Sequence, residues 1–303
     1  MSEHQSGWPH GKEPSLWRVT LSDRTIKVGF LTISVAYLIL ILLLVGADLA
    51  YLVSDSHWGG IFSDNPIAKA LQQEEIRYSI MLSMLSCTLS AFLAVTVAVP
   101  IAYILKGKTF PGRALVDSIL DIPIVLPPLV IGLSLLILFQ FPPFTLSIAK
   151  WLPFVDDPNL TLNALVVYQI PAVIVAQFTV ATAFAIATMK ATFEQTDSRM
   201  EEVALTLGCN RLQAFSRVVL PQVAPGIITA WTLAWARSLG EFGPLLVFAG
   251  TTRNKTEVLS TTVFLEISIG NLEGAVVVSL IMILLSVLVL VVTRVWGKME
   301  LSL

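Results

Sequence analysis

Long apolar stretches alternate with shorter polar ones along most of the chain. Six of these stretches have the length of a membrane span, namely 29–52, 79–105, 117–140, 164–189, 223–249 and 275–296. A helix needs about 20 predominantly apolar residues to cross a hydrocarbon core of roughly 30 Å. The pattern therefore predicts an all-α polytopic membrane protein with about six transmembrane helices, for which membrane lipid is a partner.

Composition supports this class. Of 303 residues, 55% are hydrophobic and 13% are charged, and the mean hydropathy is +0.79. A net charge of -2 does not suggest nucleic acid as a partner. Residues 1–28 are polar and are predicted to form a cytoplasmic N-terminal tail. The stretch 29–52 is too long for a signal-peptide core and lacks a small-residue cleavage site, so we expect it to be retained as the first transmembrane helix.

The distribution of Lys and Arg residues orients the predicted helices. With the N-terminus in the cytoplasm, thirteen of the 19 Lys and Arg residues fall on the cytoplasmic side and five fall in outer loops. Cytoplasmic loops of membrane proteins carry such an excess. Both termini are therefore predicted to be cytoplasmic.

Two of the predicted spans contain residues that are unusual in a membrane helix. Pro123, Pro127 and Pro128 must bend or break the third span, because each proline removes a backbone donor and clashes with the preceding turn. The fifth span contains Arg237 and Glu241, four residues apart.

A charge at the depth of Arg237 must face protein or water rather than lipid, and Glu241 is within its reach. Two interpretations remain open. The pair either holds the helices together, or Arg237 supplies positive potential to a pathway for an anion. Gly240 and Gly243 beside them allow close helix approach or local backbone adjustment.

Residues 190–222 form the longest predicted cytoplasmic segment. Helical spacing places four apolar residues on one stripe, namely Met200, Val203, Ala204 and Leu207. Gly208 is predicted to end this helix, Asn210 to cap a second short helix, and Pro221 to end the segment. The apolar stripe has two interpretations: a helical hairpin lying on the membrane surface, or a docking surface for a partner protein.

The same segment resembles a loop shared by the membrane subunits of binding-protein-dependent ABC importers, in which E-A-A is followed by three residues, a glycine, nine residues and I-x-L-P. The matching residues are Glu202, Val203, Ala204, Gly208, Val218, Leu220 and Pro221. In that family this loop forms coupling helices that dock on a cytoplasmic ATPase. The resemblance implies that Glu202, Ala204, Gly208, Leu220 and Pro221 form the coupling site.

Three further stretches narrow the resemblance. "LDIPIVLPPLVIGL" (120–133), "ARSLGEFGPLLVFAG" (236–250) and "LEISIGNLEGAVVVSL" (265–280) are similar to the permeases for tungstate, molybdate and sulfate. Pro244 departs from that group, where a small residue is more usual. The resemblance implies a type I ABC importer permease domain over 75–296, in the cytoplasmic (inner) membrane of a prokaryote.

The resemblance also implies how such a subunit works. A homodimer would enclose the pathway, an extracytoplasmic binding protein would deliver the oxyanion, and an ATPase dimer would dock on the coupling loop. Arg237, Glu241, Gly240 and Gly243 are the residues predicted to line the pathway.

We expect no catalytic residue, metal site or cofactor in this chain. His4, His10 and His57 all lie outside the predicted spans, and no metal-ligand spacing is present. The chain is therefore predicted not to be an enzyme, with ATP and Mg²⁺ bound by the partner ATPase. Two other functions stay open at this point: a stand-alone channel or secondary carrier, and a membrane-embedded enzyme.

Overall fold

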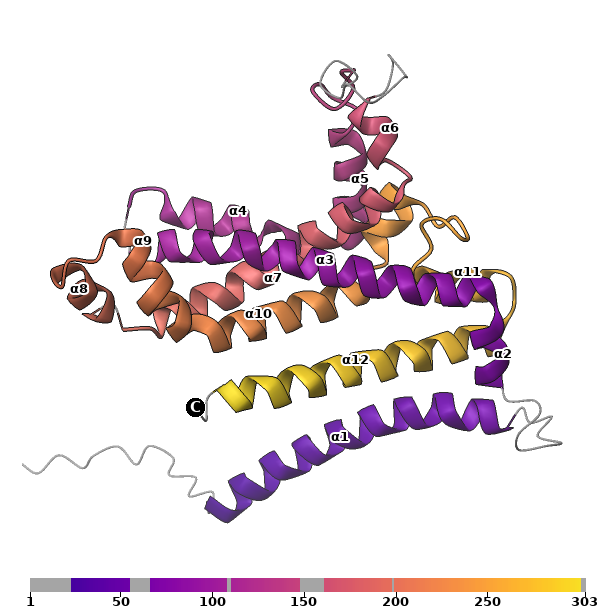
Figure 1. The fold of residues 1–303 in the computed structure, drawn as a ribbon. Coiled ribbons are helices and arrows are strands. Elements are labelled where there is room, and N and C mark those ends of the chain that lie inside the picture. The colour runs from indigo at the N-terminus through magenta and orange to yellow at the C-terminus, as the bar shows by residue number, and fades with distance from the viewer. Residues whose placement is uncertain (1–22, 55–65, 108–109, 148–160, 198, 301–303) are drawn as a thin grey trace, which may run out of the picture. The chain divides into compact units, whose positions relative to one another are not determined.

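A computed structural model describes residues 23–54, 66–107, 110–147, 161–197 and 199–300 (Figure 1). Within these ranges the chain forms helices joined by turns and loops, with no strand. The predicted N-terminal tail, 1–28, lies outside the described residues except for 23–28. These last residues already belong to helix α1 (Asp23–Ser54), so the helix begins earlier than predicted.

The chain divides into two compact units, Met1–Tyr51 and Leu52–Leu303. The first unit contains most of α1, in which Lys27–Tyr51 is long and apolar enough to span a membrane. Large apolar side chains such as Phe30, Leu42 and Leu43 are more than three-fifths exposed. A helix that is apolar all round suits a lipid environment.

The second unit contains four membrane-length helices and several shorter ones. The long helices are α3 (Glu74–Leu105), α7 (Ile170–Glu194), α10 (Leu220–Leu239) and α12 (Leu272–Glu300). The shorter α-helices are α2 (Pro66–Gln72), α4 (Arg113–Val125), α5 (Pro128–Leu138), α6 (Leu162–Val166), α8 (Arg199–Thr206), α9 (Arg211–Ala214) and α11 (Leu259–Ser268). Two π-helical segments complete it, η1 (Phe215–Val219) and η2 (Leu245–Ala249).

The core of this unit lies where α3, α7 and α10 run side by side (Figure 1). It is built largely from alanines that are 0% exposed, among them Ala94, Ala98, Ala181, Ala185 and Ala234. Small side chains let helix backbones approach closely, which is how membrane helices gain packing energy where lipid is as apolar as the protein. The alanine content of these three helices therefore explains their central position.

The predicted third span is broken, as its prolines require. Helices α4 and α5 meet at a bend of 109°, and with 13 and 11 residues each is too short to span a membrane alone. Leu126 leaves the helical conformation with ψ 139°, because the residue before a proline is pushed into the extended region. In the described part of the chain, five helices are long and apolar enough to span a membrane, and the bent pair counted as one span brings the number to the predicted six.

The predicted fifth span, 223–249, is wrong in both its limits. The apolar helix starts at Arg211 and ends at Leu239, and the chain is non-helical over 240–242 before a second helical stretch begins at Gly243. Pro221 does not end the preceding segment either, because it occupies the first turn of α10, where a missing N–H costs little. The helix ends because the glycines and the proline of 240–244 disfavour its continuation.

Candidate functional site

Arg237 and Glu241 form an ion pair at the end of α10. Arg237 Nη2 lies 2.8 Å from Glu241 Oε1, and the two side chains are 33% and 1% exposed. The Arg237 guanidinium also lies 5.3 Å from the ring centre of Phe184 on α7. Arg237 is 17 residues into a helix that rises about 1.5 Å per residue, so it lies roughly 26 Å from Leu220. The pair is therefore deep in the bundle, and Arg237 keeps part of its surface accessible.

The four residues predicted to line a pathway meet at one cavity. This cavity of about 310 Å³ is lined by Arg237, Gly240, Glu241, Phe242, Gly243, Pro127, Pro128 and Leu129. The end of α10 thus faces the bend between α4 and α5. The bend and the ion pair together form the candidate pathway site.

The backbone at Gly243 lies so close to α5 that a side chain would not fit, whereas the backbone at Gly240 has no such close neighbour. A Cβ on Gly243 would lie 2.8 Å from Pro128 Cβ and 2.9 Å from the Leu129 nitrogen. A Cβ on Gly240 would meet only carbonyl oxygens of its own helix, at 3.9 Å. Close approach therefore occurs at Gly243, whereas Gly240 ends α10 without such a contact, which is in keeping with the other predicted role, a local backbone adjustment.

Sequence reasoning missed Gly132, which makes the second close contact. A Cβ on Gly132 would lie 2.8 Å from Pro244 Cα and 2.9 Å from Pro244 O. Gly132 and Gly243 therefore let α5 pack directly on the backbone of 243–244. A single glycine in an apolar run gave no signal of this, because its partner is more than a hundred residues away.

The predicted coupling segment folds as two short helices around Gly208. Gly208 has φ +92°, which L-residues with a side chain rarely adopt, and α8 ends just before it at Thr206. Asn210 caps α9 as predicted: its side chain accepts from the Gln213 N–H at 2.8 Å, and Gln213 Oε1 accepts from the Asn210 N–H at 3.0 Å. The turn is thus fixed by local chemistry.

Only part of the predicted coupling set gathers at this turn. Ala204 is buried, at 7% exposed, and Glu202 and Gly208 are exposed beside it. Leu220 and Pro221 instead belong to α10. Met200, Val203 and Leu207 are all more than half exposed, so the predicted apolar stripe is open apart from Ala204.

A tyrosine connects α8 to the core of the bundle. Tyr103 on α3 donates to Glu201 Oε1 at 2.5 Å. The Tyr103 ring packs against Phe215 and Phe193, with ring centres 4.8 and 5.9 Å apart. Tyr103 therefore links α8 to α3, α7 and η1 through direct contacts.

A second charged cluster lies at the opposite end of the bundle, and nothing in the sequence pattern indicated it. Arg253 forms ion pairs with Glu75 on α3 and with Glu266 on α11, the latter at 2.9 Å. Asn271 Nδ2 donates to the other oxygen of Glu266 at 2.6 Å. Burial raises the pKa of the neighbouring Glu257 carboxyl above its ordinary value, and the Thr262 hydroxyl and Arg253 reduce that rise. This cluster fastens the loop after η2 to α3 and α11.

Comparison with known families decides the class of the protein. The family of the binding-protein-dependent transport system inner membrane component matches residues 95–298, which include the bend, the coupling turn and the Arg237 cavity. The chain belongs to this family. It is a membrane permease subunit of an ABC importer and not an enzyme, since ATP hydrolysis resides in a separate subunit.

Relatives of this permease extend over most of its length. The sulfate transport system permease protein CysT of Escherichia coli is 29% identical over 89% of this chain and 93% of its own. The molybdenum transport system permease protein ModB of Escherichia coli is 30% identical over 71% of this chain and 91% of its own. The molybdate/tungstate permease protein WtpB of Thermococcus kodakarensis is 31% identical over 60% of this chain and 65% of its own.

A solved structure confirms the fold of this permease. A chain of a bacterial alginate ABC transporter, in complex with an alginate-bound periplasmic protein, superposes with a TM-score of 0.67 over 92% of this chain, at 16% identity. The permease is therefore a multi-pass inner-membrane protein of a system that includes an ATPase and a substrate-binding protein.

Proposed function

We propose that this permease carries a tetrahedral oxyanion, namely tungstate, molybdate or sulfate, into the cytoplasm. The observation that carries the proposal is the set of relatives, whose names assign them to sulfate, molybdenum and molybdate/tungstate transport. The alginate transporter has only 16% identity, so it supports the fold and not the substrate.

The site at the end of α10 suits an anionic substrate. Arg237 and Glu241 line the same cavity, in which Arg237 is one-third exposed and Glu241 is 1% exposed. An anion in the cavity therefore meets the guanidinium first, and guanidinium groups bind tetrahedral oxyanions through paired donors. The Glu241 carboxylate keeps the resting charge of the site low, which favours release.

One chain supplies half of the proposed pathway. Two copies would face each other and enclose it, with both termini in the cytoplasm. An external binding protein would deliver the oxyanion at the end of the bundle that carries Arg253. The ATPase dimer would dock around Glu202, Ala204 and Gly208, where apolar side chains are exposed.

ATP and Mg²⁺ are proposed to bind to the ATPase subunits. Within the described ranges of this chain, no group of three or more His, Cys, Asp or Glu side chains is arranged to hold a metal ion. The role of the permease is to convert movement of the α8–α9 turn into opening of the pathway. The connection from Glu201 to Tyr103 supports that role.

The proposal is tested in cells that lack their own oxyanion permeases. Co-expression of this permease with its ATPase and binding protein should restore uptake of labelled tungstate, molybdate or sulfate. Gly208→Asp should abolish uptake and weaken co-purification of the ATPase, because the substitution strains the turn and adds a charge to the docking surface. If none of the three oxyanions accumulates while the complex assembles normally, the proposed substrate class is wrong.

A further inference from the structure

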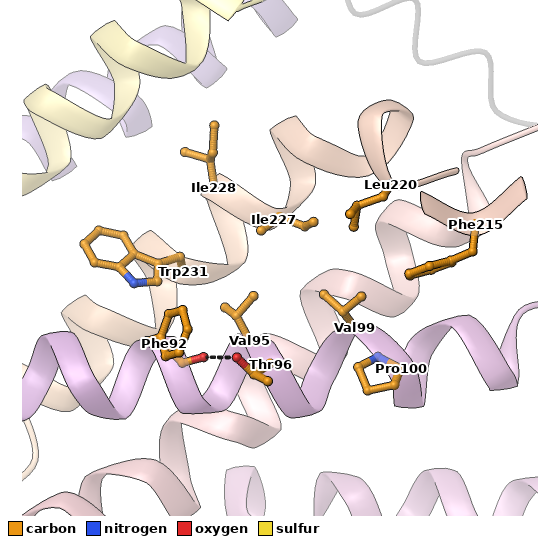
Figure 2. A pocket seen from close by; sticks show the side chains of 10 residues that line it. All are labelled: Phe92, Val95, Thr96, Val99, Pro100, Phe215, Leu220, Ile227, Ile228 and Trp231. Carbon is orange, nitrogen blue, oxygen red and sulfur yellow. Dashed lines mark hydrogen bonds between the residues drawn. The ribbon is translucent and has the colours of Figure 1, made fainter. Parts of the chain in front are cut away.

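Helix α10 has two faces of opposite chemistry. One face lines an apolar groove of about 640 Å³ with α3, shown in Figure 2. The α10 side chains in this groove are Leu220, Ile227, Ile228 and Trp231. The other face carries Gln222, Gly226, Thr229 and Arg237, spaced at 4, 3 and 8 residues, which places them on one stripe of a helix. The side chains of the groove face are apolar and suit an apolar environment. The polar side chains of the opposite stripe do not, so they are expected to have another role.

The polar stripe of α10 meets α7 at a second cavity. This cavity, here called the exit pocket, has a volume of about 540 Å³. Its lining residues are Thr192, Gln195, Thr196, Asp197, Gln222, Pro225, Gly226 and Thr229. A Cβ on Gly226 would lie 2.2 Å from Thr192 Cγ2, so the glycine lets the two helices close around the base of the pocket.

The hydrogen-bond donors that remain available in the exit pocket are amides. The hydroxyls of Thr192, Thr196 and Thr229 each donate to the carbonyl four residues earlier, at 2.9 Å. The side-chain amides of Gln195 and Gln222 make no hydrogen bond within the described part of the chain and are both exposed. Each amide offers two N–H donors; Gln222 lies on α10, and Gln195 follows directly after the end of α7. This arrangement suits an oxyanion that bridges α7 and α10.

The charge pattern along the stripe favours release. Gln222 lies 15 residues before Arg237, roughly 22 Å along the helix. An anion that leaves Arg237 toward the cytoplasm therefore reaches neutral donors, which bind about half as strongly as charged ones. Asp197 in the pocket lining, whose Oδ1 accepts from the Arg199 N–H at 2.9 Å, repels an anion that lingers there.

We propose that the exit pocket is a low-affinity oxyanion station on the cytoplasmic side of the pathway, in which the Gln195 and Gln222 amides take over the anion released from Arg237. The proposal rests on the proposed function, since it requires an oxyanion to be the transported species. The station is the last place where the protein replaces the hydration of the anion before release.

The test uses the complete importer in proteoliposomes, with labelled molybdate, tungstate or sulfate as the probe. Gln222→Glu should lower the initial uptake rate by about tenfold, because a carboxylate in place of the amide repels a dianion in the exit pocket. ATP hydrolysis stimulated by the loaded binding protein should fall much less, since neither glutamine is among the proposed docking residues Glu202, Ala204 and Gly208. Gln195→Glu on the other helix should have the same effect and serves as the independent second variant.

The matched control is Gln140→Glu, the same substitution at an exposed glutamine beyond the end of α5. It should leave uptake unchanged. If the wild-type complex carries an oxyanion but both pocket variants transport as fast as Gln140→Glu, the exit pocket does not bind the anion and this proposal is wrong. The proposed function then stands. If the wild-type complex carries none of the three anions, the proposed function itself has failed.

Discussion

The Glu241 carboxylate lies 2.8 Å from Arg237 Nη2 and is almost completely buried, while Arg237 is partly exposed. Within this pair, Glu241 is part of the buried interior and Arg237 is the accessible side chain. Ser260 on α11 donates to the Glu241 backbone carbonyl at 2.6 Å, which ties the backbone at Glu241 to α11. Both interpretations raised by the sequence are thus physically compatible, because Glu241 can pair with Arg237 inside the bundle while part of the guanidinium stays accessible at the cavity.

Replacing Arg237 alone should destabilise the protein, since it leaves a buried carboxylate without its partner. Loss of one partner of a buried pair lowers the free energy of unfolding by roughly 3–5 kcal/mol. Because Arg237 is partly exposed, the loss expected for Arg237→Ala is at or below the lower end of that range. Arg237→Ala should therefore lower the thermal unfolding temperature in detergent, and Arg237→Ala/Glu241→Gln should recover most of the loss.

The double variant separates stability from transport. With the fold restored, it should still take up oxyanion more slowly than the wild type in proteoliposomes. Full recovery of uptake along with stability would mean that the pair only holds the helices together.

The two glycines beside the pair should differ in their tolerance of a methyl group. Gly243→Ala pushes a Cβ into Pro128 and the backbone of Leu129, and overpacking of this kind costs typically about 1–3 kcal/mol. Gly240→Ala meets open space and serves as the matched control. Thermal unfolding of both variants checks this, and equal unfolding temperatures would contradict the close packing of α5 on 243–244.

The Tyr103 hydroxyl should control the order of α8. Tyr103→Phe keeps the ring packing on Phe193 and Phe215 and removes only the hydrogen bond to Glu201. Amide hydrogen exchange in α8 should become faster, with little change in α3 and α7. Unchanged exchange in α8 would mean that its position does not depend on α3.

Stability should depend on pH through Glu257. Burial raises the pKa of this carboxyl above its ordinary value of 4.5, so the folded protein holds the proton more tightly than the unfolded chain. The stabilisation that comes from the protonated Glu257 carboxyl is complete below pH 4.5, and it is lost as the pH rises through the raised pKa of the folded protein. Glu257→Gln should remove this part of the pH dependence and raise the unfolding temperature at neutral pH.

Unfolding temperatures measured from acidic to neutral pH check this prediction. Glu75 and Arg253 lie close enough to influence the Glu257 carboxyl, so the comparison is made between the wild type and Glu257→Gln under identical salt. Parallel curves for the two proteins would contradict it.

Features with local causes could be predicted from the sequence. Apolar length gives the spans, Pro127 and Pro128 give the break in the third, and Gly208 and Asn210 give the coupling turn. Each of these depends on residues within a few positions of one another.

Features that depend on distant partners could not be predicted. The sequence did not indicate that α10 ends at Leu239, because the residues up to 249 are mostly apolar and look like a continuation of the same helix. Gly132 and Arg253 gain their roles only from Pro244, Glu75 and Glu266, which the fold brings to them. A pattern confined to one segment contains no information about such contacts.

The central claim, that this permease moves an oxyanion, is tested most directly by ATP-driven uptake into proteoliposomes. The liposomes contain the purified permease with its ATPase, and the binding protein is supplied outside with labelled tungstate, molybdate or sulfate. We predict that at least one of these anions accumulates against its gradient only when ATP is present at the ATPase, and that Arg237→Ala/Glu241→Gln slows it. Absence of ATP-dependent accumulation of all three, in a complex whose ATPase responds to the loaded binding protein, would contradict the claim.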